Sequence, residues 1–128
     1  MQWKTIAAVA IAGAIGTCVR YLLQLTIQTD HWLNVTLIVN LSGSLLLGIL
    51  SGWLYIQSQK EWIRIGLGVG FCGGFTTMST FAAESIQFFN KGSEMIPYVA
   101  VSMFAGVAAC GCGIWIGTYL SERRKTRI

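Results

Sequence analysis

A stretch rich in glycine and hydroxyl side chains interrupts an otherwise apolar part of the chain, and its residue types could bind an ion. The stretch is Gly70-Phe-Cys-Gly-Gly-Phe-Thr-Thr-Met-Ser-Thr-Phe81, with three glycines and four hydroxyl residues. In lipid every backbone polar group must be satisfied internally, so a broken helix is tolerated only where it is buried in protein or lines a polar cavity. Half-helix ends and unwound carbonyls are the groups with which membrane proteins usually hold ions. The stretch therefore predicts a broken membrane helix that handles an ion.

Three polar side chains elsewhere in apolar segments are further candidates. A charge at the bilayer centre costs at least about 2.5–3.5 kcal/mol, so Arg20 is interpreted either as a packing or snorkelling arginine or as a fixed positive charge at an anion vestibule. Asn40 shares one helix face with Thr36 and Ser44, and its two N–H donors either bond a neighbouring helix or contact an anion. Glu84 is a functional candidate as an intramembrane carboxylate, although its span ends close enough for it to reach water.

Met78 and Phe81 are three residues apart and share a helix face. One interpretation makes them core side chains beside a kink that hydroxyls stabilise. The other uses the partly positive edge of an aromatic ring, which can face an anion without holding it as a full charge would. Both interpretations remain open from the residues alone.

The elements that must position these side chains are four hydrophobic spans. The chain is 54% hydrophobic and 11% charged, with a mean hydropathy of +0.61, whereas soluble domains carry about 25% charged residues. Each span has the roughly 20 residues needed to cross a bilayer. The expected spans are Trp3–Ile27, Trp32–Ile56, Trp62–Phe89 and Met95–Leu120. We therefore expect an all-α membrane protein with one four-helix domain over residues 1–128, no soluble domain and no catalytic pocket facing water.

Small residues and cysteines inside the spans have structural interpretations. Ala105, Ala109, Gly113 and Gly117 recur every four residues, which favours tight helix–helix contact. The four cysteines all fall within predicted spans without zinc-ligand partners, so they are interpreted as small buried hydrophobes.

The distribution of basic residues predicts how the chain crosses the membrane. Four spans put both termini and the middle loop on one side, which carries seven Lys and Arg residues, whereas the other side carries only Lys91. The seven are Lys4, Lys60, Arg64, Arg123, Arg124, Lys125 and Arg127. By the positive-inside rule both termini are expected in the cytoplasm of a cell whose plasma or inner membrane holds the protein. The basic tail lies beside a membrane span, which favours lipid contact over nucleic-acid binding.

Three motifs together resemble the Fluc (CrcB) family of fluoride channels, and the resemblance covers all four spans. The motifs are Gly16-Thr-Cys-Val-Arg20-Tyr21, Asn40-Leu-Ser-Gly-Ser-Leu-Leu-Leu-Gly48 and the Gly70–Phe81 stretch. The resemblance implies an antiparallel dimer of four-helix subunits, with two narrow pores that carry cytoplasmic fluoride out passively and so protect the cell from fluoride toxicity. It also implies a structural Na⁺ held between the subunits by the backbone carbonyls of Gly73 and Thr76.

For the fluoride pathway the resemblance implies Asn40, Phe81, Ser79, Thr80 and Arg20, and Glu84 is added as a candidate on its own chemistry. Met78 occupies a position where the family has a second phenylalanine, and it lacks a ring edge. This departure, together with few hydroxyls in the fourth span, predicts that one pore surface is impaired.

Three alternatives remain beside a self-sufficient channel. The bias of seven basic residues to one predicts a single orientation, which favours a heterodimer with a related chain of opposite bias. The chain could then be a non-conducting or half-competent partner subunit. A small multidrug exporter fits less well, because exchange of protons for cationic drugs needs a carboxylate in the first span, where the deep charge is Arg20 instead.

Overall fold

The computed structural model describes residues 2–27, 34–56, 60–92 and 94–125, and the regular structure in these ranges is helical. The helices are α1 (Gln2–Thr26), α2 (Val35–Ile56), α3 (Glu61–Ile65), the π-helix η1 (Gly66–Cys72), α4 (Gly73–Phe75), α5 (Met78–Asn90) and α6 (Met95–Lys125). Four of the described segments are long and apolar enough to cross a membrane, namely Gln2–Thr26, Val35–Ile56, Glu61–Asn90 and Met95–Arg124. The predicted four-helix class with a broken third span is confirmed. Trp32, the expected start of the second span, lies outside the described residues.

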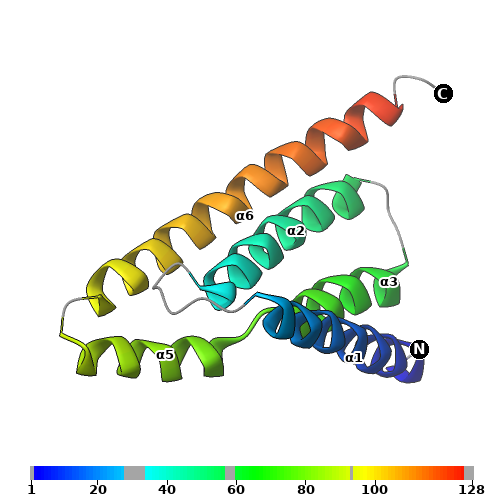
Figure 1. Cartoon of the computed structure of the whole chain (residues 1–128). Coiled ribbons are helices and arrows are strands. Elements are labelled where there is room, and N and C mark those ends of the chain that lie inside the picture. The colour runs from blue at the N-terminus through cyan, green and yellow to red at the C-terminus, as the bar shows by residue number, and fades with distance from the viewer. Residues whose placement is uncertain (1, 28–33, 57–59, 93, 126–128) are drawn as a thin grey trace.

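Two groups of helices make up the subunit (Figure 1). Helices α2 and α6 lie side by side along most of their lengths and make the most extensive contact in the fold. Helix α1 packs against α3, η1 and α4 on the other side. Helix α5 then runs towards the start of α6 and touches the rest of the subunit sparsely. The broken span therefore joins the two groups.

Glycines allow α2 and α6 to approach closely. A Cβ atom added at Gly48 would lie 2.2 Å from the carbonyl oxygen of Cys110, and one added at Gly117 would lie 2.2 Å from that of Ile49. Gly113 is equally tight against the carbonyl oxygen of Leu45, at 2.3 Å. The predicted close contact through the small residues of the last span is confirmed at Gly113 and Gly117, where backbone meets backbone as in other membrane helix pairs.

Large apolar side chains cover much of the outside of the subunit. Trp3 is 83% exposed, Phe104 79% and Ile96 77%. Removing apolar surface from water is favourable by about 25 cal/mol per Å², so lipid or a partner chain must cover these side chains. Inside, Leu37, Phe88 and Tyr98 form a small core between α2, α5 and α6. The protein is a multi-pass membrane protein.

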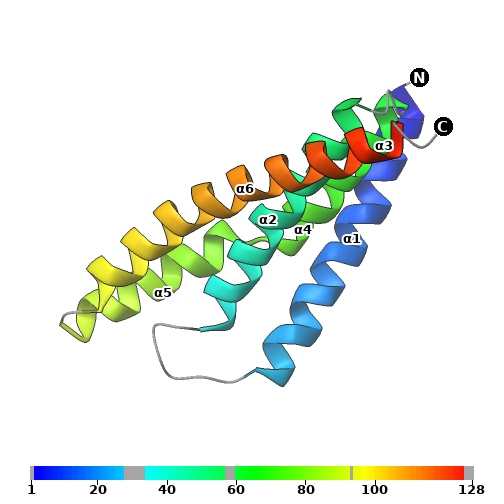
Figure 2. The ribbon, with the colours of Figure 1, turned by 90° about the horizontal axis from the view of Figure 1, so that it is seen from above.

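Both ends of the described chain lie at the same end of the bundle. The start of α1, the end of α2, the start of α3 and the end of α6 gather there (Figure 2). Lys4 and Lys60 line one shallow pocket at this end together with Trp62. The end of α5, which precedes Lys91, lies at the opposite end. The fold therefore separates the basic residues as the four-span topology requires.

Candidate functional site

The third span breaks at Thr76 and Thr77, where the backbone leaves the helical region. Thr76 has φ −76° and ψ 158°, and Thr77 has φ −142° and ψ 116°. Thr77 caps α5, because its hydroxyl oxygen accepts the backbone N–H of Thr80 at 3.2 Å, the usual device for a helix start. One α-helical turn, α4, precedes the break, and before it η1 is π-helical, a form that occurs often at functional sites. The predicted break is thus an ordered feature of the fold.

Two glycines of the motif, Gly70 and Gly74, serve the packing of α1 and not the break. A Cβ atom at Gly74 would lie 2.3 Å from the carbonyl oxygen of Gly13, and one at Gly70 would lie 2.9 Å from that of Val9. These two glycines let α1 pack directly on the backbone of the broken span. Gly73 has open space within the subunit. The hydroxyl of Thr17 on α1 donates to the carbonyl oxygen of Gly74 at 3.2 Å, which adds a polar tie.

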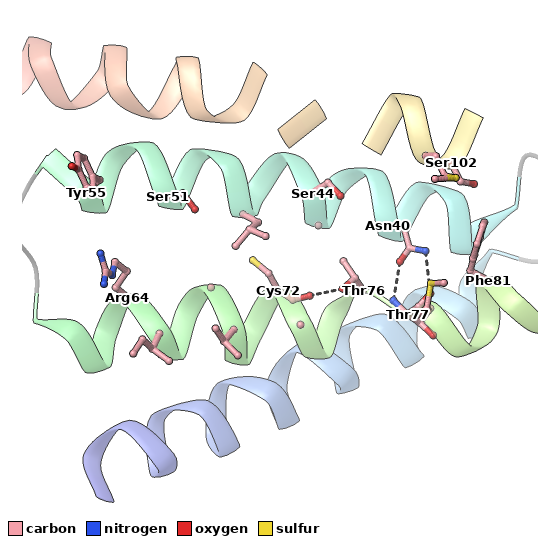
Figure 3. A pocket seen from close by; sticks show the side chains of 18 residues that line it. Asn40, Ser44, Ser51, Tyr55, Arg64, Cys72, Thr76, Thr77, Phe81 and Ser102 are labelled. Atoms are coloured by element: carbon pink, nitrogen blue, oxygen red, sulfur yellow. Dashed lines mark hydrogen bonds between the residues drawn. The ribbon is translucent and has the colours of Figure 1, made fainter. Parts of the chain in front are cut away.

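Asn40 on α2 pairs its side-chain amide with the backbone of Thr77. Its Oδ1 accepts the Thr77 N–H at 2.8 Å, and its Nδ2 donates to the Thr77 carbonyl oxygen at 3.1 Å (Figure 3). An amide nitrogen carries two protons, so one N–H of Asn40 is not used in this pair. Asn40 therefore holds the break open and still has a donor.

The hydroxyls after the break converge on one oxygen. Thr77 Oγ1 donates to Thr80 Oγ1 at 2.9 Å and lies 3.3 Å from Ser79 Oγ. Ser79 and Thr80, both predicted pathway residues, are therefore linked through Thr77, which the sequence reasoning did not single out. The sequence feature that could have identified Thr77 is its place in the hydroxyl run three residues before Thr80, the spacing of a helix cap.

A groove of about 970 Å³ runs along the subunit between α2 and the broken span (Figure 3). Asn40, Met78 and Phe81 line it, as do the predicted cation ligands Gly73 and Thr76. Met78 is 74% exposed in the subunit. Other polar residues of the groove are Ser44, Ser51, Tyr55, Arg64, Thr77 and Ser102. Five of the nine predicted site residues therefore share one open surface, whereas Ser79 and Thr80 are not among the residues that line it.

Glu84 lies outside this groove, in a cluster inside the subunit. Its Oε1 accepts the Thr36 hydroxyl at 2.8 Å, and its Oε2 accepts the Asn34 amide at 2.8 Å and the Tyr98 hydroxyl at 2.7 Å. Three helices or helix starts meet at this carboxylate. Its part in the fluoride pathway stays a prediction, and its partners Tyr98, Thr36 and Asn34 were not predicted as site residues. The i, i+4 stripe of α2 contained Thr36, but the sequence did not reveal its partner.

Arg20 is also separate from the groove. It is half-buried on α1, and its Nε atom is buried without a hydrogen-bond partner among the described residues. The hydroxyl oxygen of Ser102, which does line the groove, is likewise buried without a partner in the described part of the chain. The Ser121 hydroxyl is the third such group in the described residues, and of the three only Ser102 lines the groove.

Residues 7–114 match the protein family described as "CrcB-like protein, Camphor Resistance (CrcB)". This match covers all four membrane spans up to the middle of α6. The chain belongs to the CrcB family.

Relatives within the family are similar along nearly their whole length. The chain is 44% identical to "Fluoride-specific ion channel FluC 2" of Halalkalibacterium halodurans over 98% of this chain and 94% of that protein. It is 43% identical to the protein of the same name from Bacillus subtilis over 95% of each chain. It is 36% identical to "Fluoride-specific ion channel FluC" of Pseudomonas fluorescens over 88% of this chain and 96% of that protein. The groove and the break thus lie in a chain that these relatives match along most of its length.

Proposed function

We propose that this CrcB protein is a fluoride-specific channel that lets cytoplasmic fluoride leave the cell passively and so protects it from fluoride toxicity. The relatives named as fluoride-specific channels match nearly end to end. The observation that carries the proposal within this chain is the groove in which the amide of Asn40 faces a broken membrane helix. A channel has no chemical step, so the protein is not an enzyme.

The chemistry of the groove suits a small anion that holds water tightly. Dehydrated fluoride needs N–H and O–H donors, and conduction requires that each site be weak enough to release the ion. In the groove Asn40 supplies its remaining amide proton and Phe81 supplies a weakly positive ring edge. Ser79 and Thr80 are not among the groove-lining residues, and we propose that their hydroxyls serve the pathway from the start of α5. Met78 lines the path without a ring edge. We assign Arg20 and Glu84 to the flanking approaches, where a buried charge can act at a distance.

A second subunit in antiparallel orientation would complete the pore. The groove is open in the single subunit, and Met78, at 74% exposure, is among the side chains that lie bare along it. A second four-helix subunit would cover the groove and exclude lipid from its donors. Such an arrangement gives two pores, one for each groove.

The broken span also fits a structural Na⁺ between the subunits. No group of three or more His, Cys, Asp or Glu side chains in the described residues is arranged to hold a metal, so a cation here would depend on backbone oxygens, which suit a hard ion. The carbonyls of Gly73 and Thr76 are the ones implied. Both belong to residues at the groove where the helix ends. The ion would join two subunits and take no part in conduction.

We further propose that the subunit inserts in one orientation, with both termini in the cytoplasm, and pairs with a related chain of opposite bias. The specific observation is the excess of basic residues on the side that the sequence assigns to both termini and the middle loop, seven against one. The basic tail would contact lipid headgroups. In such a heterodimer this chain could contribute one competent pore surface while the surface with Met78 decays.

Fluoride efflux from liposomes containing this protein alone tests the proposal. If the chain pairs with itself, it conducts alone; if it needs the related chain, it conducts once that chain is added. In either case Asn40→Asp should abolish the efflux, because a carboxylate would face the Thr77 carbonyl and repel the anion. Ser42→Ala is the matched control, since the Ser42 hydroxyl bonds only carbonyls of its own helix, those of Ile38 and Val39. Undiminished efflux in Asn40→Asp would refute the assignment of the pore. Efflux only after a partner chain is added would select the heterodimer.

A further inference from the structure

Two backbone N–H groups at the break are taken away from their helical acceptors. In an α-helix the N–H of residue i bonds the carbonyl of residue i−4, so the N–H of Thr77 would bond Gly73. Instead it bonds Asn40 Oδ1 at 2.8 Å. The N–H of Thr80 would bond Thr76, and instead it bonds Thr77 Oγ1 at 3.2 Å. The carbonyls of Gly73 and Thr76 thereby lose their usual donors.

Two neighbouring carbonyls, those of Cys72 and Gly74, instead accept hydrogen bonds. The carbonyl oxygen of Cys72 accepts both the N–H and the hydroxyl of Thr76, each at 2.9 Å. The carbonyl oxygen of Gly74 accepts the hydroxyl of Thr17 at 3.2 Å. The two carbonyls released by the diverted donors are the same two that the proposed Na⁺ site requires. The side chains around the break thus decide the hydrogen bonding of the carbonyls of Cys72, Gly73, Gly74 and Thr76.

We propose that Asn40 and Thr77 are positioning residues for the cation site, an inference that rests on the proposed structural Na⁺. Asn40 keeps the Gly73 carbonyl available by capturing the Thr77 N–H, and the Thr77 hydroxyl keeps the Thr76 carbonyl available by capturing the Thr80 N–H. Neither side chain needs to touch the ion. One residue, Asn40, therefore serves the anion path and the cation site together.

The free-energy cost of an unpaired backbone N–H explains why losing these side chains should weaken the proposed Na⁺ site. Thr77 is only 5% exposed, and a buried backbone N–H without a partner is costly. Without Asn40 the nearest replacement acceptor along the chain is the helical one, the carbonyl of Gly73. The break then closes towards a continuous helix, and a cation ligand is consumed. Substitution of Thr77 by Val removes the hydroxyl that accepts the Thr80 N–H. That N–H then bonds the carbonyl of Thr76, and the second cation ligand is consumed.

The test measures Na⁺-dependent dimer stability, with no flux involved. The purified full-length protein, together with the related chain where the fluoride efflux assay shows that it is required, is titrated with NaCl against N-methyl-D-glucamine chloride at constant ionic strength, and the dimer fraction is measured by cross-linking. We expect Asn40→Ala and Thr77→Val to raise the Na⁺ concentration at half-maximal dimer by about tenfold or more. Thr77→Ser keeps the hydroxyl and should restore the wild-type midpoint, and Ser42→Ala should leave it unchanged.

The outcomes separate this inference from the Na⁺ proposal itself. If the wild-type dimer shows no response to Na⁺, both the proposed ion and this inference are refuted. If the wild type responds and both variants keep its midpoint, the ion stands and the positioning role is refuted. A variant whose thermal stability falls equally with and without saturating Na⁺, at an unchanged midpoint, also counts against the positioning role. A raised midpoint that Thr77→Ser restores supports it.

Discussion

Tyr98 on α6 donates its hydroxyl to Oε2 of Glu84 on α5 across a distance of 2.7 Å. The ring of Tyr98 also packs against two phenylalanines of α5. Its centroid lies 5.3 Å from that of Phe81 and 5.0 Å from that of Phe88. Because α5 otherwise touches the rest of the subunit sparsely, this residue pair is a main attachment of the second half of the broken span. Phe81 lines the groove, so the attachment also fixes a side chain of the proposed pore.

We expect Glu84→Gln to reduce the free energy of unfolding by about 1–3 kcal/mol, because the new amide group turns a donor towards groups that already donate. Tyr98→Phe should have a smaller effect of the same sign, since it keeps the ring and loses one hydrogen bond. Denaturation in detergent measures both. Because both changes disturb the same hydrogen bond, the double variant should lose less stability than the sum of the two single losses.

Ser85→Ala is the matched control for this cluster. The Ser85 hydroxyl bonds the carbonyl of Phe81 in its own helix, and its loss should change stability little. Strictly additive losses in the double variant would mean that Glu84 and Tyr98 do not act as a pair. A Glu84→Gln protein with wild-type stability and reduced fluoride flux would instead support the predicted role of Glu84 in the pathway.

Gly43→Ala should disturb the break from the opposite helix. A Cβ atom at Gly43 would lie 2.3 Å from Cγ2 of Thr76 and 3.2 Å from Cδ1 of Phe75. Overpacking of this kind lowers the free energy of unfolding by about 1–3 kcal/mol. The added methyl group would displace Thr76, the predicted cation ligand. We expect lower stability and lower flux. Gly106→Ala is the control, because its Cβ atom would meet only Ser44 Oγ at 3.8 Å; equal losses in both variants would contradict this account.

Phe81→Ile should cut fluoride flux sharply, because the ring edge disappears while apolar bulk remains. Met78→Phe should preserve or raise flux, since it supplies the ring edge that this position lacks. Both side chains line the groove. Fluoride efflux from liposomes at matched protein content gives the ranking. A severe loss in Met78→Phe beside an intact Phe81→Ile would place the pore on another face.

The coarse architecture followed from the sequence because each of its causes is local. Membrane spans depend on runs of apolar residues, and the α2–α6 contact depends on glycines spaced by four. The break followed from the hydroxyl run, whose first members leave the helix at Thr76 and Thr77. Groove membership of Asn40, Met78 and Phe81 was also accessible, since each lies on a predicted face.

The partners across the subunit could not be predicted from the sequence. Asn40 and Thr77 are 37 residues apart, and Glu84 and Thr36 are 48 apart, so nothing in local spacing links them. Such pairs depend on how far one helix is shifted along its axis relative to its neighbour. The sequence also suggested that the motif glycines serve the break, whereas Gly70 and Gly74 face α1. Their packing role depends on α1 lying beside them, and the spacing of residues within the motif does not reveal that neighbour.

The last prediction concerns orientation in the membrane. Six of the described basic residues lie in elements that gather at one end of the bundle, namely Lys4, Lys60, Arg64, Arg123, Arg124 and Lys125. The charge bias of short loops sets orientation, so a C-terminal tag should be accessible from the cytoplasmic side in nearly all copies. A variant with Lys4, Lys60, Arg64, Arg123, Arg124 and Lys125 changed to Gln keeps one basic residue on each side and should insert both ways, whereas Lys91→Gln should not. Equal labelling of the wild type from both sides would refute the single orientation and allow the antiparallel homodimer. Labelling from one side, together with efflux only when a chain of opposite bias is present, would establish the heterodimer.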